Sequence, residues 1–206
     1  MTDRVIAPPA IDSSEFRSFM ATFPSGVAVV TVNDVDRRPW GMTCSSVCSV
    51  TVDPPTLLIC LRRESPTLAA ISSSSCFALN LLNERGSAVA ELFSSGVHDR
   101  FDRVRWESDG RTAGPHLIAD AHAVADCRVS KTFPVSDHVV VFGEVVRVHR
   151  LAETTPTPLL YGLRRYAPWP NAGCPPATRT PSSPQSWTSS VGSLIDDDST
   201  VSNGDR

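Results

Sequence analysis

The sequence predicts a mainly β protein built around a closed, or nearly closed, antiparallel barrel. Two observations favour this class: short strand-like segments follow one another at close spacing, and only a few helical segments interrupt them. In addition, strands and helices do not alternate as they do in a doubly wound α/β fold. The length of 206 residues suits one domain, or one domain with a tail.

The first helix is expected over residues 12–23. Asp12 has the residue type of an N-cap, and Glu15 three positions later gives a pattern like a capping box. Apolar side chains recur on one face at helical spacing: Phe16, Phe19, Met20 and Phe23. Such a stripe predicts packing in the core, and the proline that follows it ends the helix.

The segments after this helix are expected to form strands: residues 27–32, 40–51, 56–61, 76–82, 121–133 and 138–150. Residues 27–32 are a β-branched run that ends at turn residues. Residues 121–133 alternate small apolar side chains with polar ones, which is typical of a half-buried strand. Gly143 indicates a bulge or bend in the last strand.

Two short helices are expected between these strands. Residues 64–74 begin with Ser65 as a cap and Pro66 at the first helical position, where a missing N–H costs nothing. Residues 83–95 begin with Asn83 as a cap, and four apolar side chains should face inward: Ala88, Val89, Leu92 and Phe93.

Composition excludes several classes of protein. The net charge of −3 and the lack of basic runs argue against nucleic-acid binding. No apolar stretch reaches the roughly 18 residues of a membrane span, and no apolar signal core opens the chain, so a cytoplasmic protein is expected. The spacing of the six cysteines and the histidines matches no zinc pattern, so no metal site and no disulfide are expected.

The expected chain has three parts. Residues 1–10 form a flexible arm, and residues 11–167 form the folded domain. Residues 168–206 are rich in Pro, Ser, Thr and Asp and have almost no periodic apolar residues. Such a segment buries too little surface to offset its chain entropy, so a disordered tail is expected.

The stretch "GMTCSSVCSV", residues 41–50, carries small hydroxyls and thiols where a purely structural strand would carry larger apolar side chains. Small side chains allow a ligand to approach the backbone, so backbone amides and hydroxyls could bind the polar edge of a flat heterocycle such as a flavin. Downstream, the segment "LRRESPT" places arginines and hydroxyls around the start of a helix. Such an arrangement is suitable for a phosphate-binding site. No Walker loop, G-x-G-x-x-G, G-x-S-x-G or H-E-x-x-H motif is present.

The order of these motifs resembles the short-chain flavin reductases, the small partners of two-component flavin-dependent monooxygenases. The resemblance continues through "FALNLL", "AELF", "RFDRVRW", "GPHL", "DHVVVFGEVV" and "PLLYGLRRY", over roughly residues 12–167. It implies the FMN-binding split barrel, a six-stranded Greek-key β-barrel with flanking helices that forms a homodimer. It also implies reduction of free FAD or FMN by NADH or NADPH, with reduced flavin supplied to a monooxygenase.

The resemblance further implies roles for individual residues. Those at the flavin ring are Gly41, Met42, Thr43, Cys44, Ser45 and Ser46, with Ser49 and Val50 beside them. Those at or near the phosphate are Ser65, Thr67, Arg62 or Arg63, and Asn80. His138 matches a histidine at the nicotinamide face, Arg165 a basic residue near the same cleft, and Phe101 a residue on the dinucleotide side.

Two other interpretations share the fold. Split barrels include pyridoxamine-phosphate oxidases, whose phosphate sites are more basic than this one. A non-catalytic flavin- or haem-binding module is the second alternative. The sequence does not determine whether the protein prefers FAD or FMN, or NADH or NADPH. It also does not identify the partner monooxygenase.

Overall fold

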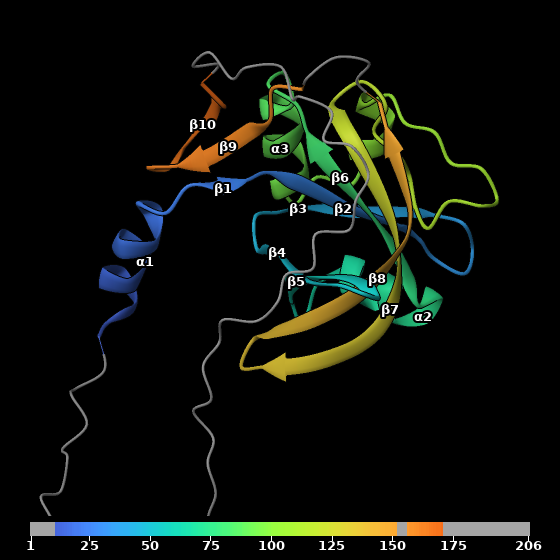
Figure 1. Ribbon diagram of the computed structural model, residues 1–206, viewed down its shortest axis with the longest axis horizontal. Helices are drawn as coiled ribbons and strands as arrows, with labels where there is room; N and C mark the ends of the chain where they lie inside the picture. Colours follow the sequence, from blue (N-terminus) through green and yellow to red (C-terminus); the bar gives the residue numbers. More distant parts are fainter. Residues whose placement is uncertain (1–10, 152–155, 171–206) are drawn as a thin grey trace, which may run out of the picture. The chain divides into compact units, whose positions relative to one another are not determined.

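The computed structural model describes residues 11–151 and 156–170, and strands dominate them (Figure 1). The helices are α1 (Ser13–Ala21), α2 (Pro66–Ser74) and α3 (Ser87–Ser94), with a 3-10 turn at Arg100–Arg103. The strands are β1 (Ser25–Gly26), β2 (Ala28–Asn33), β3 (Pro39–Cys44), β4 (Val47–Val52), β5 (Pro55–Arg62), β6 (Cys76–Leu82), β7 (Ala121–Val135), β8 (His138–Arg150), β9 (Leu159–Gly162) and β10 (Arg165–Pro168). None of the described helices is long and apolar enough to cross a membrane.

The main sheet is antiparallel, in the order β3-β2-β6-β7-β8-β5-β4. Its two outer strands, β3 and β4, are consecutive in the chain and are separated only by Ser45 and Ser46. Residues 39–52 therefore act as one bent strand, pairing with β2 in the first half and with β5 in the second. This bend closes the sheet into a barrel of six strands, and the expected mainly β fold with few helices is confirmed.

A small second sheet, in the order β1-β9-β10, continues from the barrel. Backbone bonds join the two, from Val27 N to Leu159 O at 3.1 Å and from Leu82 N to Val27 O at 3.0 Å. β10 extends to Pro168, one residue beyond the expected end of the domain. The expected arm and residues 171–206 of the expected tail lie outside the described residues.

Both faces of β2 are buried, and each face belongs to a different core. Val30 and Val32 point into the barrel and pack with a cluster that includes Phe77. Val29 points the other way and packs beneath α3 with Phe93. Because side chains alternate along a strand, one β-branched run supplies both cores.

Helix α1 confirms one prediction and contradicts another. The Asp12 carboxylate accepts hydrogen bonds from Ser14 N and Glu15 N at 2.7 and 2.9 Å, as an N-cap should. The apolar stripe, however, is not in the core: α1 has no buried residue, and the side chain of Phe19 is 67% exposed. Helical periodicity indicates that a face needs covering, but the cores of the barrel are filled by other elements.

Helix α2 begins as predicted, with Pro66 at its first position. The Ser65 hydroxyl, in contrast, makes no capping bond. It lies 3.2 Å from the Met42 sulfur and donates to it, which ties the start of α2 to β3.

The predicted cap of helix α3 is wrong. Asn83 lies in a turn, where its side-chain oxygen accepts from Arg85 N at 2.9 Å. The helix begins at Ser87, after Gly86. The competing local bond of the asparagine is typical of Asx turns, and the helix starts three residues further along the chain than predicted.

Strand β7 departs from simple alternation. Its polar side carries Asp126, whose side chain is only 2% exposed, because the segment between the 3-10 turn and β7 covers this face. The bulge expected at Gly143 lies on the partner strand, where β7 inserts an extra residue between Val129 and Lys131. Gly143 is required by packing instead, since an added Cβ would lie 2.5 Å from the Phe77 ring.

Candidate functional site

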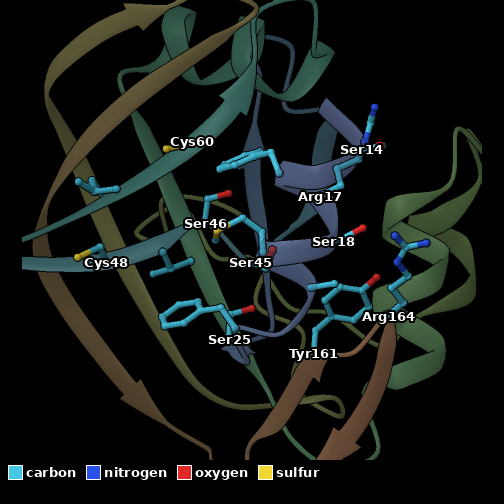
Figure 2. A pocket seen from close by; sticks show the side chains of 16 residues that line it. Ser14, Arg17, Ser18, Ser25, Ser45, Ser46, Cys48, Cys60, Tyr161 and Arg164 are labelled. Carbon is cyan, nitrogen blue, oxygen red and sulfur yellow. The ribbon is translucent and has the colours of Figure 1, made fainter. Parts of the chain in front are cut away.

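A pocket with a volume of about 780 Å³ lies between α1 and the barrel. Its lining comes from α1, the bend between β3 and β4, β5, and the turn after β9. Figure 2 shows Ser45 and Ser46 at the centre, with Cys48 and Cys60 on one side and Tyr161 and Arg164 on the other. Ligand pockets commonly have volumes of roughly 300–1,000 Å³, so this pocket has the size of a small-molecule site.

The bend at Ser45 and Ser46 explains why this stretch uses small hydroxyl residues. Both residues are exposed and fall between the β3–β2 and β4–β5 ladders. Ser46 O accepts from Cys60 N at 3.3 Å, which holds the bend against β5. The two hydroxyls therefore line the pocket with little side-chain bulk between the ligand and the backbone.

The charged groups in the described lining are arginines, Arg17 from α1 and Arg164 from the β9–β10 turn, with no acidic residue among them. Such a lining favours an anionic ligand, and guanidinium groups suit phosphate oxygens. Leu163 and Arg164 have positive φ angles of 51° and 60°, so the chain reverses sharply there. This turn brings Arg164 to the pocket, whereas Arg165 belongs to β10 and pairs with Gly162.

Residues 41–44, the first half of the hydroxyl-rich stretch, make contacts within the protein. An added Cβ at Gly41 would lie 3.0 Å from the Phe93 ring, and Gly41 O accepts from Arg100 Nη1 at 2.8 Å. The Thr43 hydroxyl donates to Ala90 O at 2.6 Å. The backbone of β3 thus needs small residues because α3 packs directly against it.

Met42 and Cys44 point into the barrel core. The Cys44 thiol donates to the carbonyl oxygens of Ser46 and Cys60, each at 3.9 Å. Burial raises the pKa of this thiol to about 11, although both of these bonds oppose the shift. Cys44 therefore stays protonated at neutral pH. The five described cysteines are free, and Cys174 lies outside the described residues.

Asn80 is a structural amide at the centre of the protein. It is fully buried, its Nδ2 donates to Val29 O, Thr31 Oγ1 and Pro115 O, and its Oδ1 accepts from Leu117 N at 2.8 Å. These bonds join β6 to β2 and to the loop before β7. The structure does not bring Asn80 to the pocket lining.

Phe101 is also buried, and its ring contacts Phe93 and Trp106 edge-to-face at centroid distances of 5.1 and 5.9 Å. Ser49 and Val50 are exposed on β4, and Ser49 points to the opposite face from Cys48 because side chains alternate. Thr67 is buried in α2. None of these four residues lines the pocket.

Arg62 and His138 extend the pocket face along the sheet. Leu58 and Cys60 line the pocket, and Arg62 follows them on the same face of β5. His138 is directly opposite Arg62 on β8, so the two side chains share that face. Arg63 points away from it and donates to Ser136 O at 2.7 Å.

His138 is held by its neighbour, with Nδ1 2.9 Å from Asp137 Oδ1. The hydrogen bond and charge of His138 lower the pKa of the fully exposed Asp137 carboxyl. A second, smaller pocket of about 420 Å³ lies beside these groups and is lined by Arg62, Arg63, Glu64, Ser136 and Asp137. Of the predicted phosphate and nicotinamide residues, Arg62 and His138 are therefore neighbours, at one end of the face that carries the main pocket.

Comparison with known proteins identifies the family. The model of the flavin reductase like domain matches residues 20–170. The chain belongs to this family. A flavin reductase (NADPH) from Lentzea aerocolonigenes is 48% identical over 163 residues, which cover 79% of this chain and 94% of the relative.

Solved structures of other flavin reductases share the fold. The NADH:FAD oxidoreductase of Streptomyces globisporus, in complex with NAD and FAD fragments, has a TM-score of 0.72 and 28% identity, covering 79% of this chain and 96% of its own. The flavin reductase of the styrene monooxygenase from Pseudomonas putida has a TM-score of 0.68 and 28% identity, covering 75% and 97%.

The pocket of this flavin reductase family member fits a flavin by its own chemistry. Ser45 and Ser46 offer hydroxyls for the polar ring edge, and Arg17 and Arg164 offer cations for the phosphate. The sequence identified the two serines. It missed Arg17, Tyr161 and Arg164, although the "GLRRY" motif pointed to the neighbour of Arg164 and the apolar stripe pointed to α1.

Asn80→Ala should lower the free energy of unfolding by about 2 to 3 kcal/mol, because it leaves buried partners such as Leu117 N unsatisfied. Denaturant unfolding measures this change, and Asn83→Ala, at a half-buried position whose side-chain bonds lie at the surface, is the control, with a loss below about 1 kcal/mol. Folded Asn80→Ala should bind flavin normally. A stable variant that had lost flavin binding would indicate that Asn80 belongs to the ligand site.

Proposed function

We propose that this chain is an NAD(P)H-dependent flavin reductase that reduces free FAD or FMN and supplies reduced flavin to a partner monooxygenase. The observation that carries the proposal is the pocket at the β3–β4 bend, with small hydroxyls at its centre and arginines at its rim. The 48% identity to a relative named flavin reductase (NADPH) supports the activity. The likeness to the styrene monooxygenase reductase supports the kind of partner.

In this proposal the protein binds and orients two ligands. A bound flavin supplies N5 as the acceptor of the hydride from nicotinamide C4. Ser45 and Ser46 hold the polar edge of the ring, and Arg17 and Arg164 bind phosphate oxygens. Arg62, with the start of α2 nearby, offers a second anion contact at the far end of the same face. No protein acid or base is needed.

Flavin is proposed to be an exchangeable substrate. Each hydroxyl or amide contact contributes on the order of 1 kcal/mol net, somewhat more when charge-assisted, and association costs several kcal/mol against that sum. The buried Cys44 thiol offers no nucleophile for covalent attachment, because it stays protonated. Binding in the micromolar range is therefore expected.

Gel-filtered protein should lose most of its flavin and oxidise NAD(P)H only when free flavin is added, with saturation in flavin concentration. Steady-state rates measured with FAD and FMN, each crossed with NADH and NADPH, give the preference for both substrates. Flavin binding without NAD(P)H oxidation would identify a non-catalytic binding module. Full activity in flavin-free buffer would identify an oxidase with a resident cofactor.

A homodimer is proposed from the apolar surface beside the pocket. Phe16 and Phe19 of α1 and Phe23 just after it are 53%, 67% and 67% exposed, and Phe133 on β7 is 57% exposed. Phe133 is opposite Val140, which is opposite the pocket residue Cys60, so it continues the same face of the sheet. Apolar surface of this extent is typical of a protein–protein interface.

Phe19→Asp should convert the dimer to a monomer, because it places a charge in the proposed interface without altering a residue of the pocket lining. Light scattering at micromolar concentration measures the mass. Val35→Asp, in an exposed turn between β2 and β3, is the control and should remain dimeric. A wild-type monomer with full activity would contradict the proposal.

His138 is proposed to contact the nicotinamide side of the site. His138→Ala should raise the KM for NAD(P)H several-fold while flavin affinity changes by no more than a few-fold. His98→Ala, an exposed histidine away from this face, should leave both constants unchanged. Equal losses of flavin and NAD(P)H binding would indicate a structural role for His138, and no loss would remove it from the site.

A further inference from the structure

A cluster of two histidines and one carboxylate lies outside the flavin pocket. His116 Nε2 is 2.9 Å from Asp126 Oδ1, and His149 Nε2 is 3.3 Å from Asp126 Oδ2. One ligand atom from each of the three residues lies within 4.8 Å of the other two. None of the three residues lines the main pocket.

Three separate segments build this cluster. Asp126 is on β7 and His149 on β8, where His149 is opposite Val124. Val124 and Asp126 share one face of β7, so His149 and Asp126 share it as well. His116 comes from the loop that covers this face, and its backbone pairs with Glu107 through bonds of 2.9 and 2.7 Å.

One oxygen of the Asp126 carboxylate has hydrogen-bond partners, and the other oxygen has none among the described residues. Oδ1 accepts from Ala113 N and contacts His116 Nε2, both at 2.9 Å. Asp126 Oδ2 and His149 Nε2 are buried and have no hydrogen-bond partner among the described residues. The Asp126 side chain is 98% buried, so an unpartnered oxygen there is costly unless a cation or proton is shared with it.

We propose that His116, Asp126 and His149 bind a divalent transition-metal ion of the zinc class. Imidazole nitrogens and a carboxylate oxygen are ordinary ligands for Zn²⁺. With bonds of about 2.0–2.1 Å and tetrahedral angles, ligand atoms lie roughly 3.3 Å apart. The distances of 2.9 and 3.3 Å between the nitrogens and the carboxylate oxygens are close to that spacing.

Of the three residues, His149 has the most exposed side chain. The His149 side chain is 35% exposed, whereas those of His116 and Asp126 are 7% and 2% exposed. An ion would therefore enter past His149 to reach the buried ligand atoms. Bound there, it would hold the loop that carries His116 against β7 and β8, which is a structural role rather than a step in flavin reduction.

The sequence gives little sign of this site. The three ligands are ten and 23 positions apart along the chain, as 116, 126 and 149, and match no short zinc motif. Only the antiparallel pairing of β7 with β8 and the return of the covering loop bring them together.

Zinc titration of the full chain tests the proposal. The protein is treated with a chelator, the chelator is removed, and Zn²⁺ is added in competition with a chromophoric indicator. A Cys48→Ser background removes an exposed thiol that could bind zinc independently. One zinc per chain is expected, with a rise in melting temperature and slower amide exchange in the loop that carries His116.

His149→Gln is the decisive variant, because it removes a half-exposed ligand and keeps the side-chain size. Zinc affinity should fall by at least about 100-fold, since even the loss of an outer-shell partner costs 10- to 100-fold. His98→Gln, at an exposed position, should change affinity by less than about twofold. The melting temperature without zinc, compared with that of the parent, reports whether His149→Gln is folded.

Co²⁺ provides a second measurement that does not depend on the variant. Cobalt at the proposed site should give visible bands of tetrahedral or five-coordinate geometry without thiolate charge transfer. Zinc binding that survives His149→Gln, thiolate bands with cobalt, or no binding by the wild-type chain would overturn the proposal. The last outcome would leave the cluster as a hydrogen-bonded histidine–aspartate pair. Flavin reduction, assayed in parallel, tests the proposed function separately.

Discussion

Closure of the barrel by one bent strand is the constraint on which the rest of the structure depends. Residues 39–44 must pair with β2, and residues 47–52 must pair with β5 on the other side of the sheet. The chain can meet both demands only by leaving the ladders at Ser45 and Ser46. The same two residues are the centre of the pocket, so the opening that receives a ligand is a direct result of how the sheet closes.

The sequence predicted most strands because their apolar patterns are local. β6 was predicted at its observed bounds, and α2 began at the predicted proline. The errors arose where a distant contact decides the outcome. The stripe on α1 has the periodicity of a core helix, yet periodicity gives only the direction of the apolar face. Whether that face packs on the same chain or on another depends on space already filled by α3 and β2.

The sequence predicted those residues of the pocket that lie next to one another along the chain. The hydroxyl-rich stretch led to Ser45 and Ser46 in the pocket lining. It also suggested roles at the ligand for Gly41 and Thr43, and the structure shows these two residues in contact with α3. Asn80 illustrates the same limit, because a buried amide that joins three segments looks, in sequence, like any polar residue on a strand. Arg164 and Arg165 are adjacent, and only the left-handed turn at Leu163 and Arg164 determines which one reaches the pocket.

In the proposed homodimer, the location of the pocket would couple ligand binding to assembly. One wall is α1, a helix with no buried residue in this chain, and the opposite wall is the barrel. A wall of this kind gains little stability from its own chain, so its position depends on what covers its exposed aromatic face. A second copy that covered α1 and the neighbouring face of β7 would fix both walls together. In the proposed dimer the barrel would carry the contacts to the flavin ring. Assembly would hold in place the elements that form the rim, so that each ligand could leave without disturbing the barrel.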